Sequence, residues 1–276
     1  EDARDKEFKK TKITRFIRPF SKPLDALITA ARTSHNQMVR LHALWAIGQM
    51  GRTPALEHIQ ELVPLILDKD SEVRAQTAKI MGDVRYDGAY TALLQLLQDS
   101  DSRVRYFATL SAGRFGDNRA TDRILAMLRE NGERDPYLRH AGIMALTMID
   151  GGKAAQAAVK DNSPSVRMAG LLALRKLEDS NVASFLKDSD SFLVLEAARA
   201  ITDIPLNDAM PKLAELTKNA KASDPILRRA MNANLRLGKS SNAQAIANLV
   251  AQTSVSEAIR VEGLEFLGDW AKPGGR

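Results

Sequence analysis

The feature that most constrains this chain is a short motif that recurs at nearly regular intervals. An arginine follows an apolar residue, and four residues before it stands a side chain such as Asp70 or Asp101, which suits the N-cap of a helix. Successive copies lie 27 to 34 residues apart, a spacing typical of helical repeat proteins. We call the arginine position the anchor. The anchors are Arg40, Arg74, Arg105, Arg139, Arg167, Val194, Arg228 and Arg260.

The residues around each anchor predict one amphipathic helix. The third residue after the anchor is small in most copies, as in Ala108, and the seventh is apolar, as in Leu146, so both lie on one helical face. Another amphipathic segment precedes each such helix, for example Leu56 to Leu67. One helix pair cannot bury its apolar face alone, so neighbouring pairs must stack. The sequence therefore predicts an all-α solenoid of about eight helix-turn-helix repeats over residues 22–272.

Composition and motifs exclude several kinds of site. The chain has no cysteine, which excludes disulfides, zinc-thiolate sites and haem attachment within it. We find no Walker loop, no G-x-S-x-G and no H-E-x-x-H among its residues. No apolar run is long enough to cross a membrane. We therefore expect no catalytic role, no metal site and no cofactor in this chain, and no transmembrane segment.

The pattern D-x-D-S-x-V-R, as in Asp68 to Arg74 and Asp99 to Arg105, resembles HEAT repeats. The resemblance covers residues 22–272 and implies a right-handed α-solenoid. It also implies a ladder in which aspartates before the second helix of each repeat pair with the anchor arginines, so that Arg105 would pair with acids such as Asp99. The ladder residues are Asp68, Arg74, Asp99, Arg105, Arg139, Asp161, Arg167, Asp188, Arg228 and Arg260.

Two phrases carry a narrower resemblance. The stretches Arg40 to Gly48 (RLHALWAIG) and Gly268 to Pro273 (GDWAKP) are similar to the HEAT segment of large bacterial envelope proteins. Those proteins join a quinoprotein-type sugar dehydrogenase propeller to a c-type cytochrome domain. The resemblance implies an excised middle region of a haem-binding, membrane-associated dehydrogenase, located in the periplasm or cell envelope. Its partners would be sister domains of the same polypeptide. The alternative is a free-standing scaffold that binds a protein partner.

The arginine row has a second interpretation, as a set of phosphate contacts in a nucleic-acid-binding or DNA-glycosylase-like solenoid. The charge distribution disfavours it. Of the net charge of +6, residues 1–22 contribute eight Lys/Arg against four Asp/Glu, and the other 254 residues contribute 32 against 30. Acids accompany most anchors, and aromatic residues for base stacking are scarce. A structural ladder is the favoured interpretation.

The N-terminal segment, residues 1–21, is basic and amphipathic. Its apolar residues Ile13, Phe16, Ile17 and Phe20 follow helical spacing. We expect it to cap the first repeat, although contact with an anionic surface or a nucleic acid is an alternative. Residues 273–276 are expected to be a frayed end or the start of a linker. The residues of the alternative basic contact are Lys9, Lys10, Lys12, Arg15 and Arg18.

The outward face of the second helices is the candidate binding face. Positions one and five after the anchor point away from the buried stripe, and in several repeats they hold apolar residues. An exposed apolar face indicates an interface with a protein partner, whereas twist between repeats could instead bury these side chains. Full burial of Trp45, Tyr106 and Met144 would contradict an interface. The residues are Leu41, Trp45, Tyr106, Leu110, His140, Met144, Met168, Leu172 and Leu195. The sequence predicts no oligomeric state.

Overall fold

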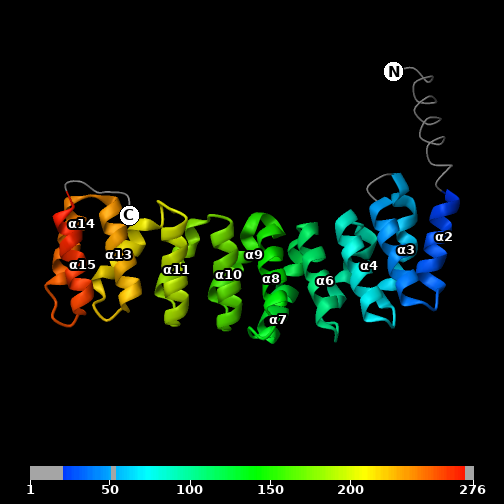
Figure 1. Cartoon of the computed structure of the whole chain (residues 1–276), viewed down its shortest axis with the longest axis horizontal. Coiled ribbons are helices and arrows are strands. Elements are labelled where there is room, and N and C mark those ends of the chain that lie inside the picture. Colours follow the sequence, from blue (N-terminus) through cyan, green and yellow to red (C-terminus); the bar gives the residue numbers. More distant parts are fainter. Residues whose placement is uncertain (1–20, 51–53, 271–276) are drawn as a thin grey trace, which may run out of the picture. The chain divides into compact units, whose positions relative to one another are not determined.

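The structure is a computed structural model that describes residues 21–50 and 54–270. All regular elements in that part of the chain are helical, and they follow one another as helix pairs (Figure 1). The predicted all-α solenoid is therefore confirmed. The chain divides into two compact units, Glu1–Gly151 and Gly152–Arg276, which we call unit 1 and unit 2. The predicted N-terminal cap and the predicted frayed end lie outside the described residues.

Unit 1 holds the first four repeats. Their first helices are α2 (Ser21–Thr33), the 3₁₀ helix η2 (Pro54–Leu67), η3 with α5 (Asp87–Ala89, Tyr90–Leu96) and η4 with α7 (Asn118–Ala120, Thr121–Asn131). Their second helices are α3 (Gln37–Met50), α4 (Ser71–Val84), α6 (Ser102–Phe115) and α8 (Pro136–Met148). Each second helix contains one anchor arginine, as the motif predicts.

The short 3₁₀ segment η5 (Ile149–Gly152) follows α8. Unit 2 holds the other four repeats. Their first helices are α9 with η6 (Lys153–Ala157, Ala158–Lys160), η7 (Ser180–Lys187), α12 with η8 (Met210–Ala214, Glu215–Lys218) and α14 (Ser240–Val250). Their second helices are α10 (Pro164–Lys176), α11 (Ser191–Asp203), α13 (Asp224–Leu237) and α15 (Glu257–Gly268).

Side-chain caps explain where many of the second helices begin. The carboxylate of Asp101 accepts hydrogen bonds from the N–H groups of Arg103 and Val104, in the first turn of α6. Such a cap satisfies N–H groups that have no partner within the helix. Equivalent caps are formed by Asn36, Asp70, Asp135, Asp190 and Ser256. The local motif thus explains the start of six of the eight second helices; Ser163 forms no side-chain cap on α10, and α13 begins at Asp224 itself, one residue earlier than the motif predicts.

Glycine lets the second helices of unit 1 approach one another closely. The eighth residue after the anchor is Gly82 in α4 and Gly113 in α6. A Cβ atom on Gly82 would lie 2.1 Å from Oγ of Ser111 and 2.6 Å from its Cα. A Cβ on Gly113 would lie 2.6 Å from Cα of Ala145 in α8. Because no larger residue fits, the backbones of α4, α6 and α8 are in direct contact.

In unit 2 the same position holds larger side chains in three repeats, among them Thr202 in α11 and Arg236 in α13, and glycine again in α15 at Gly268. A Cβ atom on Gly268 would meet nothing within 4 Å, so the close approach seen at Gly82 and Gly113 is not repeated there. None of the described helices has the length and apolar character that a bilayer crossing demands.

Candidate interaction surfaces and the arginine ladder

Anchor arginines in unit 1 link one repeat to the next. Arg40 binds the carboxylate of Asp68, with Nη1 3.0 Å from Oδ1 and Nη2 2.5 Å from Oδ2. Arg74 binds Asp99 in the same bidentate manner, through Nε and Nη2, both at 2.8 Å. Its Nη1 also donates to the backbone carbonyl of Asp68 at 2.8 Å. One guanidinium thus joins the turn of its own repeat to the turn of the following repeat.

Unit 2 contains the same geometry once. Arg167 donates to Asp188 from Nε at 2.8 Å and from Nη2 at 3.0 Å. Its Nη1 donates to the backbone carbonyl of Asp161 at 2.9 Å. Arg167 and Asp188 are 12% and 7% exposed, so water competes little for this pair. Lysine cannot substitute for arginine in such a pair, because its ammonium group lacks the planar fork that donates two parallel hydrogen bonds to one carboxylate.

These contacts alter the ionisation of the aspartates. Burial alone would raise the pKa of the Asp99 carboxyl. Hydrogen bonds from Arg74 and from the N–H of Asp101, together with the charge of Arg74, outweigh burial and lower that pKa below its ordinary value of 3.8. The same balance lowers the pKa of Asp68 and of Asp188. These three aspartates, Asp68, Asp99 and Asp188, therefore carry full charge at neutral pH.

Arg105 does not bind the carboxylate of Asp99, contrary to the pairing that the sequence suggested. Its Nη1 donates to the backbone carbonyls of Asp99 at 2.6 Å and Ser100 at 3.1 Å. The reason is that the Asp99 carboxylate already accepts two hydrogen bonds from Arg74 of the preceding repeat. Asp68, Asp99 and Asp188 pair with the arginine of the repeat before them, not with their own anchor.

Other anchors depart from this pattern. Arg139 pairs with Glu133 in the turn of its own repeat. Arg228 pairs with Glu262 at 2.7 Å, and Nε of Arg260 donates to the carbonyl of Val250 at 3.0 Å. The predicted ladder is therefore made of separate rungs, and towards the C-terminus the arginines find other partners.

The predicted binding face is exposed only in part. Trp45 is 41% exposed, whereas Leu41 and Met168 are buried at 5% and 9%. Placing Leu41 and Met168 on an exposed face was wrong: α3 packs against α4 and α10 against α11, and both side chains are covered in the structure. His140 is exposed. Half-buried side chains are Tyr106, Leu110, Met144, Leu172 and Leu195.

A hydrogen-bonded network holds Trp45 in place on the surface of unit 1. Its Nε1–H donates to Oε1 of Gln76 at 2.9 Å, and Nε2 of Gln76 donates to Oε1 of Glu72 at 2.7 Å. Glu72 in turn accepts Nε of Arg103 at 2.7 Å. The guanidinium of Arg103 lies 5.1 Å from the ring centroid of Phe107. This tryptophan network connects α3, α4 and α6.

Sequence reasoning missed part of this face. Two residues before the anchor, Met38 is 52% exposed, Tyr137 71% and Phe192 57%. That position is three residues before the first of the two positions that we used, so it lies on the same helical face. The three-residue spacing in the sequence could therefore have identified this position as part of the face. The candidate basic contact at Lys9, Lys10, Lys12, Arg15 and Arg18 lies outside the described residues.

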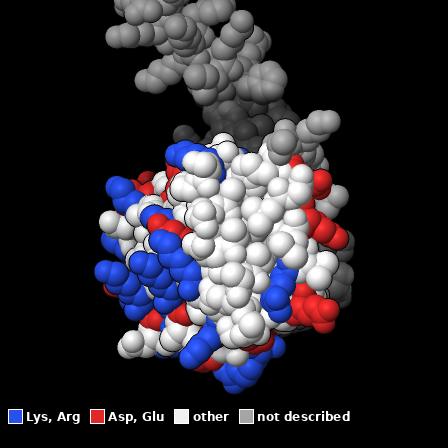
Figure 2. All heavy atoms as spheres, turned by 90° about the vertical axis from the view of Figure 1, so that its left-hand side faces the viewer, with Lys and Arg blue, Asp and Glu red and all other residues white. Residues whose placement is uncertain are grey.

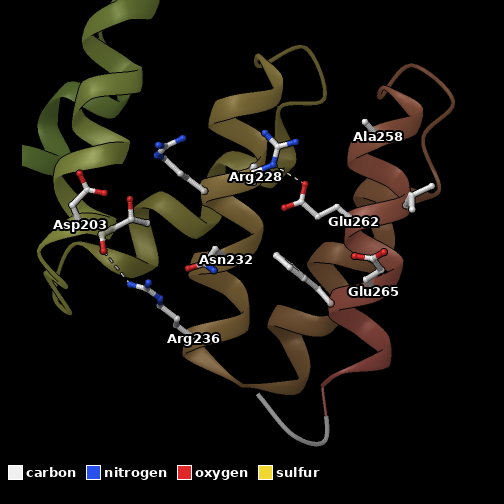
Figure 3. A pocket seen from close by; sticks show the side chains of 11 residues that line it. Asp203, Arg228, Asn232, Arg236, Ala258, Glu262 and Glu265 are labelled. Carbon is white, nitrogen blue, oxygen red and sulfur yellow. Dashed lines mark hydrogen bonds and ion pairs between the residues drawn. The ribbon is translucent and has the colours of Figure 1, made fainter. Parts of the chain in front are cut away.

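Unit 2 has a groove that the sequence did not suggest. It lies between α13 and α15 beside the end of α11, and its volume is about 600 Å³ (Figure 3). Arginines project from α13 and carboxylates from α15, and the ion pair between Arg228 and Glu262 spans the two helices. The lining residues are Thr202, Asp203, Arg228, Arg229, Asn232, Arg236, Ala258, Val261, Glu262, Glu265 and Phe266.

The surface beside the groove has little charge. Figure 2 looks onto the end that carries α14 and α15, and it shows a broad field without charged side chains next to a cluster of Lys and Arg. Helix α14 contains no charged residue, and on α15 Val261 and Leu264 are 49% and 59% exposed. Within residues 21–50 and 54–270, no three His, Asp or Glu side chains form a group that could hold a metal ion.

Two family models match this chain. The model described as HEAT repeats matches residues 59–147, and the model described as the PBS lyase HEAT-like repeat matches residues 39–63. Residues 39–147 are therefore similar to HEAT and HEAT-like repeats. The narrower resemblance to dehydrogenase-linked envelope proteins has no counterpart in these matches. No curated protein matches the chain in sequence.

Solved structures of similar arrangement come from several sources. The Escherichia coli protein YibA is 17% identical over 88% of this chain and 92% of its own, with a TM-score of 0.42. Human deoxyhypusine hydroxylase, solved in complex with glycerol, is 17% identical over 92% and 97%, with a TM-score of 0.36. The complex of CpcE and CpcF of phycocyanin lyase from a Nostoc species is 19% identical over 90% and 94%, with a TM-score of 0.38.

The matches correct one expectation from the sequence. We expected no catalytic role, on the ground that the repeats carry no known catalytic motif. That prediction is wrong as an inference from this fold, because a hydroxylase and a lyase are among the similar structures. The matches assign no activity to this chain.

Proposed function

We propose that this helical repeat protein binds another protein through the second-helix face of unit 1. The observation that carries the proposal is Trp45, which is 41% exposed although its indole N–H is already satisfied by Gln76. Because this hydrogen bond already orients the ring, a partner that packs against it gains a large apolar contact with little further loss of side-chain conformational entropy. Met38 is exposed on the same helix as Trp45, and Tyr137 is exposed on the second helix of the fourth repeat.

The ladder geometry favours a protein partner over a nucleic acid. Arg40, Arg74 and Arg167 each donate two hydrogen bonds to an aspartate of the next repeat. Guanidinium groups held in this way are not available to neutralise phosphates. The stretch around Trp45 resembles part of large envelope proteins, which supports sister domains of the same polypeptide as the partner. The other class of partner is a separate protein.

The test compares what three forms of the chain capture from an extract of the cells that produce it. The forms are the wild type, the double variant Trp45→Ala/Tyr137→Ala, and Phe192→Ala, which removes an exposed aromatic ring from unit 2. We expect the wild type and Phe192→Ala to capture the same proteins. The double variant should fail to capture them. Circular dichroism verifies that all three forms are folded.

Capture of the same proteins by all three forms would refute a binding role for this face. A separate titration with duplex DNA at two salt concentrations tests the alternative. Affinity at low salt that falls steeply as salt rises would support nucleic-acid binding instead.

A further inference from the structure

The groove in unit 2 carries an inference of its own. We propose that the groove between α13 and α15 binds a short peptide segment of another protein, one that bears both an acidic and a basic side chain. This site is distinct from the Trp45 face in unit 1, and its chemistry is different.

Each wall carries a charge that the described residues do not neutralise. On α13, the guanidinium of Arg229 donates only to the backbone carbonyl of Pro225, at 3.0 Å, four residues earlier in its own helix. On α15, the carboxylate of Glu265 has no ion-pair partner among the described side chains, and it is exposed. Arg229 and Glu265 thus both line the groove, the cation from α13 and the anion from α15.

The ion pair between Arg228 and Glu262 links the two walls at 2.7 Å. Arg228 is 46% exposed, and exposed pairs of this kind contribute little to stability. A ligand can therefore break this ion pair and form ion pairs of its own with Arg228 and Glu262 at a small cost in free energy. The pair also keeps the acidic wall and the basic wall facing each other while the groove is empty.

Apolar atoms lie between the charges. Phe266 is buried at 5%, and Val261 is 49% exposed. Both residues line the groove together with Ala258. An aliphatic or aromatic side chain of a ligand would cover Val261, which water now reaches. The groove volume of about 600 Å³ lies within the range of ligand sites in proteins.

Opposite charges on the two walls select the kind of ligand. A phosphate or a nucleic-acid backbone would be attracted by α13 but repelled by Glu262 and Glu265 on α15. A peptide that carries both charges can match both walls. Arg228 and Arg236 are eight residues apart, which corresponds to about 12 Å along the helix. An extended peptide of about four residues covers that length.

The test uses a displayed library of random eight-residue peptides, selected on the full chain. We expect the enriched peptides to combine at least one Asp or Glu with at least one Lys or Arg and an apolar residue. Fluorescence anisotropy then measures the dissociation constant of the best peptide for variants of the chain. Arg229→Gln and Glu265→Gln should each weaken binding about tenfold. Glu215→Gln and Lys218→Gln, two exposed residues of η8 in the same unit, are the controls and should leave it unchanged.

A charge exchange makes the test sharper. The double variant Arg229→Glu/Glu265→Arg should lose the selected peptide and gain affinity for a peptide in which the acidic and basic residues have been exchanged. Since both positions are surface positions, the variant should fold, and its circular dichroism spectrum verifies this.

Three results would overturn the proposal. One is a selection that enriches nothing above the library background. Another is enrichment of purely acidic peptides, which would make the groove an anion site. The third is a selected peptide that binds Arg229→Gln and the wild type equally well but loses affinity for Trp45→Ala. That result would place peptide binding on unit 1 and would leave the function proposed above intact.

Discussion

The close approach of the second helices in unit 1 makes a quantitative prediction. Gly48, Gly82 and Gly113 occupy the same repeat position, and each is the third residue from the end of its helix. Replacing glycine by alanine inside a helix stabilises it by up to about 1 kcal/mol. This intrinsic gain is the same at the three positions, so any difference between them reports packing alone.

The distances decide which effect is larger. A Cβ on Gly82 or Gly113 would lie 2.6 Å from a Cα atom of the next second helix, so backbones must separate. Overpacking of this kind costs about 1–3 kcal/mol, and we expect both variants to be destabilised by about 1–2 kcal/mol net. At Gly48 the nearest atom is Cγ1 of Ile80 at 3.0 Å, and that side chain can move. Gly48→Ala should be neutral or slightly stabilising.

Urea denaturation followed by circular dichroism measures the three free energies of unfolding. Thermal midpoints should differ by several degrees, since 1 kcal/mol corresponds to about 2–4 °C in a domain of this size. Equal shifts for Gly48→Ala and Gly82→Ala would refute the reasoning, because they would show that helix contact at this position does not limit residue size.

Other predictions concern the ladder and a buried tyrosine. Asp99→Asn removes the charge that Arg74 binds and should cost about 2–3 kcal/mol in urea denaturation, whereas Asp25→Asn, at an exposed position of α2, should change little. Because folding lowers the pKa of Asp99 from 3.8, the rung stabilises the protein above about pH 4. Its contribution is lost as the pH falls through the folded pKa, so the difference between wild type and Asp99→Asn should shrink as the pH is lowered below 3.8. Burial raises the pKa of Tyr90 from 10.0 to about 12, so an ultraviolet titration should show one late tyrosine that Tyr90→Phe abolishes. The stability that this group contributes below pH 10 should be lost as the pH rises towards 12, and a tyrosine spectrum that titrates uniformly near 10 would contradict this.

The elements that were predicted correctly depend on local chemistry. Asp101 and Asp135 begin helices because a carboxylate four residues before the anchor can accept the free N–H groups of the first turn. That relation is complete within a few residues, so the sequence contains all of it. The stacking of helix pairs follows because an amphipathic pair has no other way to bury its apolar face.

The contacts that sequence reasoning misplaced all join different repeats. Asp99 precedes Arg105 by six residues, yet its carboxylate binds Arg74 in the preceding repeat. Which arginine it meets depends on how adjacent turns are offset, and that offset arises from packing between helices. Trp45 likewise owes its orientation to Gln76 in the next repeat. A periodic pattern places such residues on a face but does not tell which neighbour they reach.

The groove shows that one repeat position carries more information than the motif itself. The anchor and the caps are nearly uniform along the chain, whereas the eighth residue after the anchor varies between glycine, as in Gly82 and Gly113, and larger residues, as in Thr202 and Arg236. At Gly82 and Gly113 the second helices touch, so no ligand can enter between them. Between α13, which carries Arg236 at this position, and α15 there is a groove that Arg229 and Glu265 line. The regular positions of the repeat stabilise the array, and the positions that differ between repeats determine which ligand can bind. Variation within an otherwise regular repeat is therefore the sequence feature to examine for a binding site.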